Sequence, residues 1–131
     1  MLSSLLGHAA AFAATFMSAP AAPSPFAGSW SGTVTIGTQA RLEQTLEVSA
    51  SGMFTGTFLN IGNGGTGTIL GHIGQDGSFT LIALVDGIPG NVGITCGQFQ
   101  IAPNGHLVTV TFGIQEQGCN SPGWSQDLER Q

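Results

Sequence analysis

GSWSGTVTI (residues 28–36) and RLEQTLEV (residues 41–48) show the pattern on which this chain is built. In both stretches apolar or small side chains alternate with hydroxyl or charged ones. Trp30 and Val34 therefore share one face of the first stretch, while Thr33 lies on the other. A period of two is typical of a β-strand with one face buried and one in water. The two stretches therefore predict consecutive strands of an antiparallel sheet.

The same alternation returns along the rest of the chain. Further strands are expected at residues 54–58, 68–73, 79–85, 92–101, 106–115 and 123–130, between turns rich in Gly, Asn and Asp. Asp76-Gly77 is a strong hairpin signal, because both residue types accept positive φ angles. Short strands at this spacing predict an all-β domain, an antiparallel up-and-down barrel of about eight strands. A β-sandwich of two sheets is the alternative.

Composition limits the partners of the chain. Charged residues make up 7% of its 131 residues, the formal net charge is -5, and Arg41 and Arg130 are the two basic residues besides histidine. Nucleic acid is disfavoured as a partner because phosphate binding needs clustered Lys and Arg. An acidic membrane surface is disfavoured for the same reason. The length suits one domain.

The beginning of the chain has a different composition. Residues 1–21 combine an uncharged stretch rich in Leu, Ala and Phe with Ala19-Pro20-Ala21, a small-x-small cleavage site. This pattern predicts a signal peptide and a secreted or periplasmic protein; an ordinary Ala-rich leader is the alternative, since no Lys or Arg precedes the apolar stretch. The stretch is too short and too Ala-rich for a stable membrane anchor. Residues 22–27 are expected as a linker and residues 28–131 as the barrel domain.

Cys96 and Cys119 are the two cysteines of the chain. In a small secreted domain a single pair usually forms a disulfide. Cys96 falls within an expected strand and Cys119 just beyond the next one, so a hairpin would bring them close. Such a crosslink would stabilise the fold by about 3 kcal/mol. Two separate buried thiols are the alternative.

Two features of the chain resemble the calycin superfamily, which includes lipocalins, avidins and related small barrels. Gly28-Ser29-Trp30 opens the first strand, and Arg130 lies at the end of the last. The resemblance implies a barrel-closing pair in which Arg130 stacks over Trp30, worth about 0.5–2 kcal/mol. A minimal bacterial or avidin-like barrel fits better than a long lipocalin, because no helix is evident after the last strand. Biotin binding is not expected, because the chain has no Tyr and only two Trp.

Two kinds of binding are expected from such a barrel. In the first hypothesis, a small apolar ligand occupies the open end. In the second, side chains fill the barrel and the protein recognises another protein, for example as an inhibitor that inserts residues 20–26 into its target. The inward glycines, among them Gly56 and Gly71, favour either a cavity or strong bending of the strands. The candidate ligand-lining residues are aromatic and amide side chains: Phe54, Phe58, Phe79, Phe99, Phe112, Gln44 and Gln98.

No catalytic or metal-binding motif is evident in the sequence. His72 and His106, the histidines beyond the leader, belong to no metal-ligand pattern. Residues 62–67 match the G-x-G-x-x-G nucleotide motif, but a strand is expected after them where that motif needs a helix. We therefore expect a non-enzymatic protein without metal or cofactor. The sequence leaves its ligand, its protein target and its oligomeric state open.

Overall fold

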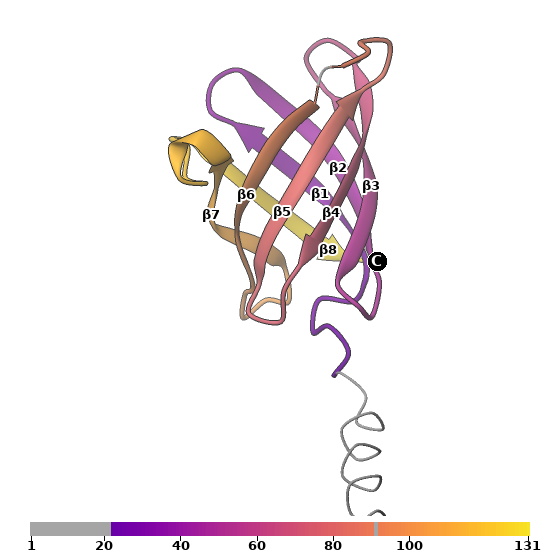
Figure 1. Ribbon diagram of the computed structural model, residues 1–131, viewed down its shortest axis with the longest axis vertical. Coiled ribbons are helices and arrows are strands. Elements are labelled where there is room, and N and C mark those ends of the chain that lie inside the picture. The colour runs from indigo at the N-terminus through magenta and orange to yellow at the C-terminus, as the bar shows by residue number, and fades with distance from the viewer. Residues whose placement is uncertain (1–21, 91) are drawn as a thin grey trace, which may run out of the picture.

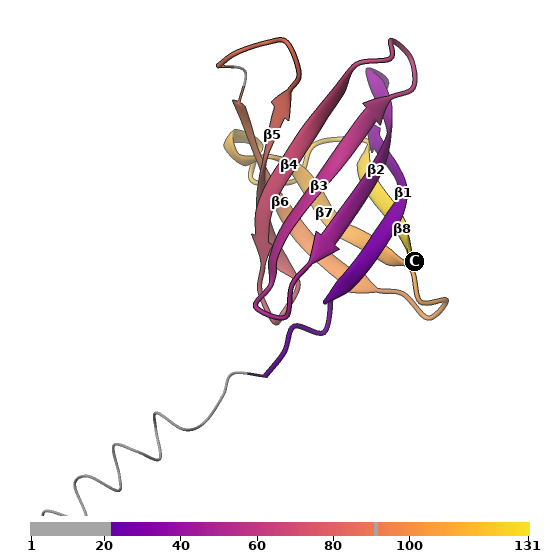
Figure 2. The ribbon, with the colours of Figure 1, turned by 90° about the vertical axis from the view of Figure 1, so that its right-hand side faces the viewer.

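Eight antiparallel strands close into one barrel, in which each strand pairs with the next along the chain and β8 returns to β1. The computed structural model describes residues 22–90 and 92–131. Figure 1 and Figure 2 show the tilted strands around a common axis. The predicted up-and-down barrel is confirmed, and the two-sheet sandwich is wrong. The strands are β1 (Gly28–Ile36), β2 (Ala40–Val48), β3 (Met53–Asn60), β4 (Thr66–Ile73), β5 (Ser78–Val85), β6 (Val92–Ile101), β7 (Leu107–Ile114) and β8 (Trp124–Arg130).

Helical structure is limited to one 3₁₀ turn, η1 (Gln115–Gln117), within the described ranges. It lies in the connection between β7 and β8. No helix in this part of the chain is long and apolar enough to cross a membrane. The expected signal peptide, residues 1–21, lies outside the described residues.

The alternating pattern places apolar side chains inside the barrel. Cross-strand partners share a face, so the register of Trp30 opposite Leu46 sends both side chains inward. Both are at most 1% exposed. Every strand contributes to the apolar core, which consists of Phe26, Trp30, Val34, Leu46, Val48, Phe54, Ile69, Ile73, Phe79, Leu81, Phe99, Leu107, Phe112 and Leu128.

Inward glycines allow close contacts within this barrel. A Cβ atom at Gly56 would overlap the carbonyl oxygen of Thr45 in the neighbouring strand. At Gly71 it would overlap the ring of Phe54, which lies across that position. The backbones and the aromatic ring approach this closely only because the glycines lack a side chain. At both positions the space beside the glycine is therefore occupied by neighbouring atoms and is not part of a cavity.

One end of the barrel, which we call the closed end, is sealed by a segment expected as a linker. Phe26 is buried in the core, and its carbonyl oxygen accepts a hydrogen bond of 2.9 Å from the Trp30 indole N–H. The Arg130 guanidinium lies 4.2 Å from the centroid of the Trp30 ring and donates to the carbonyl oxygen of Ala27 at 2.8 Å. Residues 24–27 are thus part of the packed domain, and Phe26 is not free to insert into another protein.

The turn between β4 and β5 is held by a carboxylate. Asp76 Oδ1 accepts hydrogen bonds from the backbone N–H of Ser78 at 3.0 Å and from its hydroxyl at 2.7 Å. The backbone hydrogen bond first, and the hydroxyl second, lower the pKa of Asp76 from its ordinary value because both stabilise the ionised carboxylate. The predicted Asp-Gly turn is thus stabilised by hydrogen bonds between its own residues.

The barrel is least regular around β7. Phe99 pairs with Thr109 while Gln98 pairs with Thr111, so Val110 is an extra residue that bulges out of the ladder. β7 in turn pairs with β8 at its first two residues, Leu107 and Val108. Beyond this point the two strands separate, and the connection between them, residues 115–123, contributes to the wall of the barrel.

Candidate functional site

The end opposite the closed end, which we call the mouth, carries the β1–β2, β3–β4, β5–β6 and β7–β8 connections (Figure 1). Apolar interior surface meets solvent at this end. Four side chains that pack against the core are only partly buried there: Ile36, Leu42, Phe58 and Trp124. Partly exposed apolar groups inside a concave site are typical of ligand-binding positions.

A hollow of about 510 Å³ lies at the mouth, between the β1–β2 turn and the β7–β8 connection. We call it the mouth hollow. Ile36, Ile114 and Trp124 give it an apolar surface, and Gln39, Gln117 and Ser121 give it amide and hydroxyl groups. Its volume lies within the range of small-molecule sites, roughly 300–1,000 Å³.

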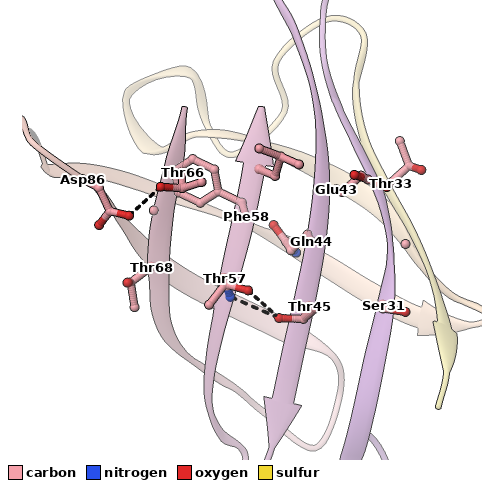
Figure 3. Close-up of a pocket in the computed structure, with 13 residues that line it drawn as sticks. Ser31, Thr33, Glu43, Gln44, Thr45, Thr57, Phe58, Thr66, Thr68 and Asp86 are labelled. Carbon is pink, nitrogen blue, oxygen red and sulfur yellow. Dashed lines mark hydrogen bonds between the residues drawn. The ribbon is translucent and has the colours of Figure 1, made fainter. Parts of the chain in front are cut away.

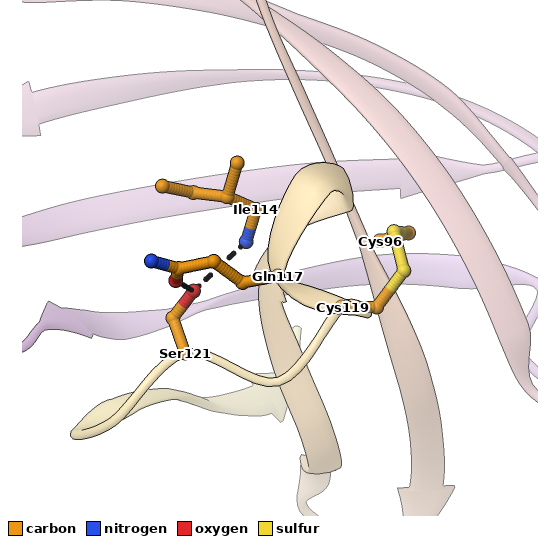
Figure 4. The surroundings of a disulfide bond; sticks show 5 residues. All are labelled: Cys96, Ile114, Gln117, Cys119 and Ser121. Carbon is orange, nitrogen blue, oxygen red and sulfur yellow. Dashed lines mark hydrogen bonds between the residues drawn. A yellow bond between two sulfur atoms is a disulfide. The ribbon is translucent and has the colours of Figure 1, made fainter.

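The disulfide between Cys96 and Cys119 positions one wall of the mouth hollow (Figure 4). It joins β6 to the β7–β8 connection, and the two Cα atoms are 4.9 Å apart. Ser121 secures the same connection: its hydroxyl accepts from the N–H of Ile114 at 3.0 Å and donates to Gln117 Oε1 at 2.5 Å. The wall is therefore held covalently and by hydrogen bonds, although it contains little regular structure.

Two buried glutamines lie in the interior on either side of β1. Gln44 of β2 is 4% exposed and Gln126 of β8 is 2% exposed. The Nε2 group of Gln44 donates a hydrogen bond of 2.6 Å to Oε1 of Gln126. The backbone N–H of Gln126 donates to the Thr109 hydroxyl at 3.0 Å, where β7 and β8 separate. The amide pair therefore ties together three strands around the irregular part of the barrel.

The pair is not fully satisfied. Nε2 of Gln126 is buried and has no hydrogen-bond partner among the described residues, and the same holds for the hydroxyl of Thr95. Leaving a buried polar group unpaired costs about 1–3 kcal/mol, so each such group in a native fold needs an explanation. Gln126 lies on the same inward face of β8 as Trp124, two residues farther from the mouth. A free donor is thus held in the interior beyond the mouth hollow.

Most of the predicted ligand-lining phenylalanines fill the barrel. Phe54, Phe79, Phe99 and Phe112 are all buried in the core. The rings of Phe79 and Phe99 stack with 4.2 Å between their centroids, and Phe79 lies 5.9 Å from Phe112. These side chains occupy the closed end and the centre of the barrel, which leaves the mouth as the open part.

The remaining predicted residues are divided between the two sides of the barrel wall. Phe58 lies inside, toward the mouth, with its ring across Gly67. The inward orientation expected for Gln98 is wrong, because its cross-strand partner is Ser78 on the outer face of β5. Its side-chain amide donates to the backbone carbonyl of Asp76.

Sequence reasoning missed several residues of the mouth hollow. Ile36, Ile114 and Trp124 were not among the candidate ligand-lining residues. Trp124 follows from the two-residue period that also points Gln126 and Leu128 inward along β8. The residues that the β7–β8 connection contributes to the mouth hollow could not be predicted in this way, because irregular segments have no side-chain period.

A second hollow, of about 610 Å³, lies on the outer surface of β1–β4 (Figure 3). Hydroxyl side chains of neighbouring strands line it, and those of Thr45 and Thr57 hydrogen-bond to each other at 2.9 Å. At its edge the hydroxyl of Thr66 donates to Asp86 at 2.7 Å. These groups meet water or one another, so this groove lacks the unpartnered buried donor that marks the interior beyond the mouth.

The His–carboxylate contact in the described ranges lies at the closed end. His106 Nδ1 is 2.7 Å from Asp127 Oδ1, and its Nε2 is 3.4 Å from Glu129 Oε1. Both carboxylates are exposed on the outer surface. No group of three or more His, Cys, Asp or Glu side chains in the described part of the chain is arranged to hold a metal ion.

Comparisons of this chain with protein-family models, with curated proteins and with solved structures found no significant match.

Proposed function

We propose that this protein is a non-enzymatic barrel that binds a small, neutral, largely apolar molecule at its mouth. The observation that carries the proposal is the buried, unpartnered Nε2 group of Gln126 beyond a mouth of partly exposed apolar side chains. A ligand with an apolar body and one hydrogen-bond acceptor would cover the apolar surface and supply the missing partner.

The ligand is expected to be neutral. No charged side chain is buried among the residues that the structure describes. Arg130 lies at the closed end over Trp30, and Arg41, near the mouth end of β2, is exposed on the outer face of the barrel. A carboxylate in the mouth would lose its hydration without meeting a cation, which is costly. A ketone, ester or amide carbonyl needs only the N–H of Gln126. We therefore favour an apolar carbonyl compound over a fatty acid.

Binding requires Trp124 to move. Its partly buried ring meets Phe112 edge-on with 5.3 Å between centroids. Because Trp124 lies nearer the mouth than Gln126 on the same face, an acceptor that reaches Gln126 displaces the indole. Trp30, at the closed end, is 1% exposed and is not expected to respond. Tryptophan fluorescence is therefore a site-specific probe of binding.

The test is a fluorescence titration with a medium-chain ketone and with the alkane of the same length. The ketone is expected to bind about tenfold more tightly, because one buried hydrogen bond contributes roughly 1.5 kcal/mol. Gln126→Met should remove this preference. Gln100→Met, a matched change on the outer face of β6, should retain it. A preference that survives Gln126→Met, or binding of neither compound, would contradict the proposal.

Relationship and location are part of the same proposal. The closed eight-stranded barrel and the stacking of Arg130 over Trp30 support a calycin-like relationship. The disulfide, together with the predicted signal peptide, supports a secreted or periplasmic location, because disulfides persist in oxidising compartments. A binding role rather than catalysis is supported by the position of His106 and its carboxylates at the end opposite the mouth.

Protein recognition is the second candidate function. It is favoured by the filling of the barrel centre by the core phenylalanines, which leaves a ligand less room. It is also favoured by aliphatic side chains exposed on the outside of β4–β6. Insertion of residues 20–26 into a target, however, is disfavoured because Phe26 is buried in its own barrel.

A further inference from the structure

The outer surface of β4, β5 and β6 carries a row of aliphatic side chains. Leu70, Ile82 and Ile94 are direct cross-strand partners on three adjacent strands, and Leu84 lies two residues farther along β5. Leu70, Leu84 and Ile94 are 39%, 37% and 44% exposed, and Ile82 between them is half-buried. We call these four residues the aliphatic face. Figure 1 shows their three strands side by side across the front of the barrel.

The opposite side of the barrel has different chemistry. The outward residues of β1, β2 and β8 are Ser, Thr, Glu, Asp and Arg side chains, and include Glu43, Glu47, Asp127 and Glu129. In the described part of β4–β6, by contrast, no outward side chain is an Asp, Glu, Lys or Arg. Asp76 and Asp86 lie in the turns at the two ends of β5. The barrel therefore has one acidic side and one side whose described outward residues include no Asp, Glu, Lys or Arg, where the aliphatic face lies among Thr, Ser, Gln and His72.

We propose that the aliphatic face binds a second copy of this chain, forming a two-fold symmetric dimer. An isologous contact needs a surface that is complementary to itself. A two-fold axis through Ile82 would set Leu70 of one copy against Ile94 of the other, so that aliphatic groups meet aliphatic groups along the whole row. Exposed apolar surface of this kind marks association sites on soluble proteins.

Charge selects this face for self-association. Each copy has a formal net charge of -5, so two copies repel wherever their acidic sides approach. Contact through β4–β6 puts the carboxylates of β1, β2 and β8 on the far sides of the dimer. Their separation then exceeds the Debye length of about 8 Å at physiological ionic strength. A partner of opposite charge would instead be drawn to the acidic side.

The size of the face predicts a weak dimer. Three neighbouring strands of about eight residues cover roughly 14 by 26 Å in projection, from the usual strand spacing and rise. With side-chain relief, two such faces bury on the order of 1,000 Å², near the lower limit for a specific interface. A dissociation constant in the micromolar range is expected.

Sedimentation equilibrium of the chain, expressed with its own leader, tests the proposal. The mass should rise from monomer to dimer with concentration, and Ile82→Lys should weaken association by about 100-fold or more, because it places an unpaired charge in the contact. Ser125→Lys, the same charge on an exposed position of β8, should leave association unchanged. Ile94→Thr keeps a β-branched residue and should also weaken association, which covers a failure of Ile82→Lys to fold.

Each outcome decides the proposal. A dimer that is lost in Ile82→Lys or Ile94→Thr, but kept in Ser125→Lys, supports it. A chain that stays monomeric up to its solubility limit overturns it. A dimer that persists in both aliphatic-face variants also overturns it, because another surface would then hold the copies together. Ligand binding at the mouth is read by fluorescence and is independent of these results.

Discussion

Replacing Gln44 and Gln126 together by Met is expected to stabilise the barrel while weakening ligand binding. Both side chains are almost fully buried and share one hydrogen bond of 2.6 Å. Met has a side chain of similar length and shape, so the exchange adds little steric strain. It removes a polar group that has no hydrogen-bond partner among the described residues, and it removes the donor on which the proposed ligand depends.

The magnitude follows from two contributions. Losing the buried hydrogen bond costs about 1 kcal/mol, whereas removing the unpartnered Nε2 group relieves about 1–3 kcal/mol. The double variant should therefore gain about 1 kcal/mol, which is about 4 °C in Tm at roughly 2.1 cal/mol/K per residue over residues 22–131. Gln126→Met alone leaves Nε2 of Gln44 without its acceptor. The single variant should therefore lose about 1 kcal/mol.

Urea unfolding, followed by circular dichroism on the parent, both single variants and the double variant, measures these free energies. A double-mutant cycle then isolates the coupling between the two amides. A double variant less stable than the parent by about 1 kcal/mol or more would show that Nε2 of Gln126 already has a partner, such as an ordered water. In that case Nε2 of Gln126 would not be available to donate a hydrogen bond to a ligand.

Three further predictions concern the frame around the site. Gly56→Ala should destabilise the barrel by about 2–3 kcal/mol, because its Cβ overlaps a neighbouring carbonyl oxygen, whereas Gly93→Ala, with open space around its Cβ, should stay within about 1 kcal/mol of the parent. Thermal melts compare the two, and equal values would contradict the close backbone contact as the reason for glycine at position 56. Replacing Cys96 and Cys119 by Ser should lower the free energy of unfolding by about 3 kcal/mol and weaken ketone binding; unchanged affinity would mean that the disulfide does not shape the mouth hollow. The lowered pKa of Asp76, caused mainly by the backbone hydrogen bond in its turn, contributes stability above about pH 4 that is lost as pH falls through the folded-state pKa. Asp76→Asn should therefore flatten the acid limb of the stability curve, and an unchanged slope in acid titration would count against this role.

The first strands were predicted well because polar side chains mark their wet face. The structure places β2 at Ala40–Val48, within one residue of the expected start, with Leu42, Gln44, Leu46 and Val48 inward. In β5 both faces carry apolar residues, and yet Leu84 on the outer face is exposed. A pattern with apolar residues on both faces therefore reports association potential as readily as burial.

The later part of the barrel shows the limit of periodicity. The extra residue Val110 shifts the register between β6 and β7, and no side-chain pattern announces such a bulge. Phe26 was assigned to a linker because it follows the prolines at positions 23 and 25, but tertiary packing against Trp30 makes it part of the core. The residues of the candidate site likewise could not be predicted from the sequence alone. Inward orientation could be read for several phenylalanines, whereas the depth at which each one lies depends on the tilt and stagger of the strands.

The pairing of the first and last strands has a practical consequence. Trp30 lies opposite Arg130, so the described chain enters and leaves the barrel at the same end, and the mouth lies at the other (Figure 1). Both ends of the described chain therefore lie at the closed end, opposite the proposed binding site. A linker or solid support attached after residue 131 would leave the rim pointing away from the attachment point. Immobilisation through the carboxyl terminus should therefore preserve access to the mouth, which makes the barrel suitable for surface display or as a sensor.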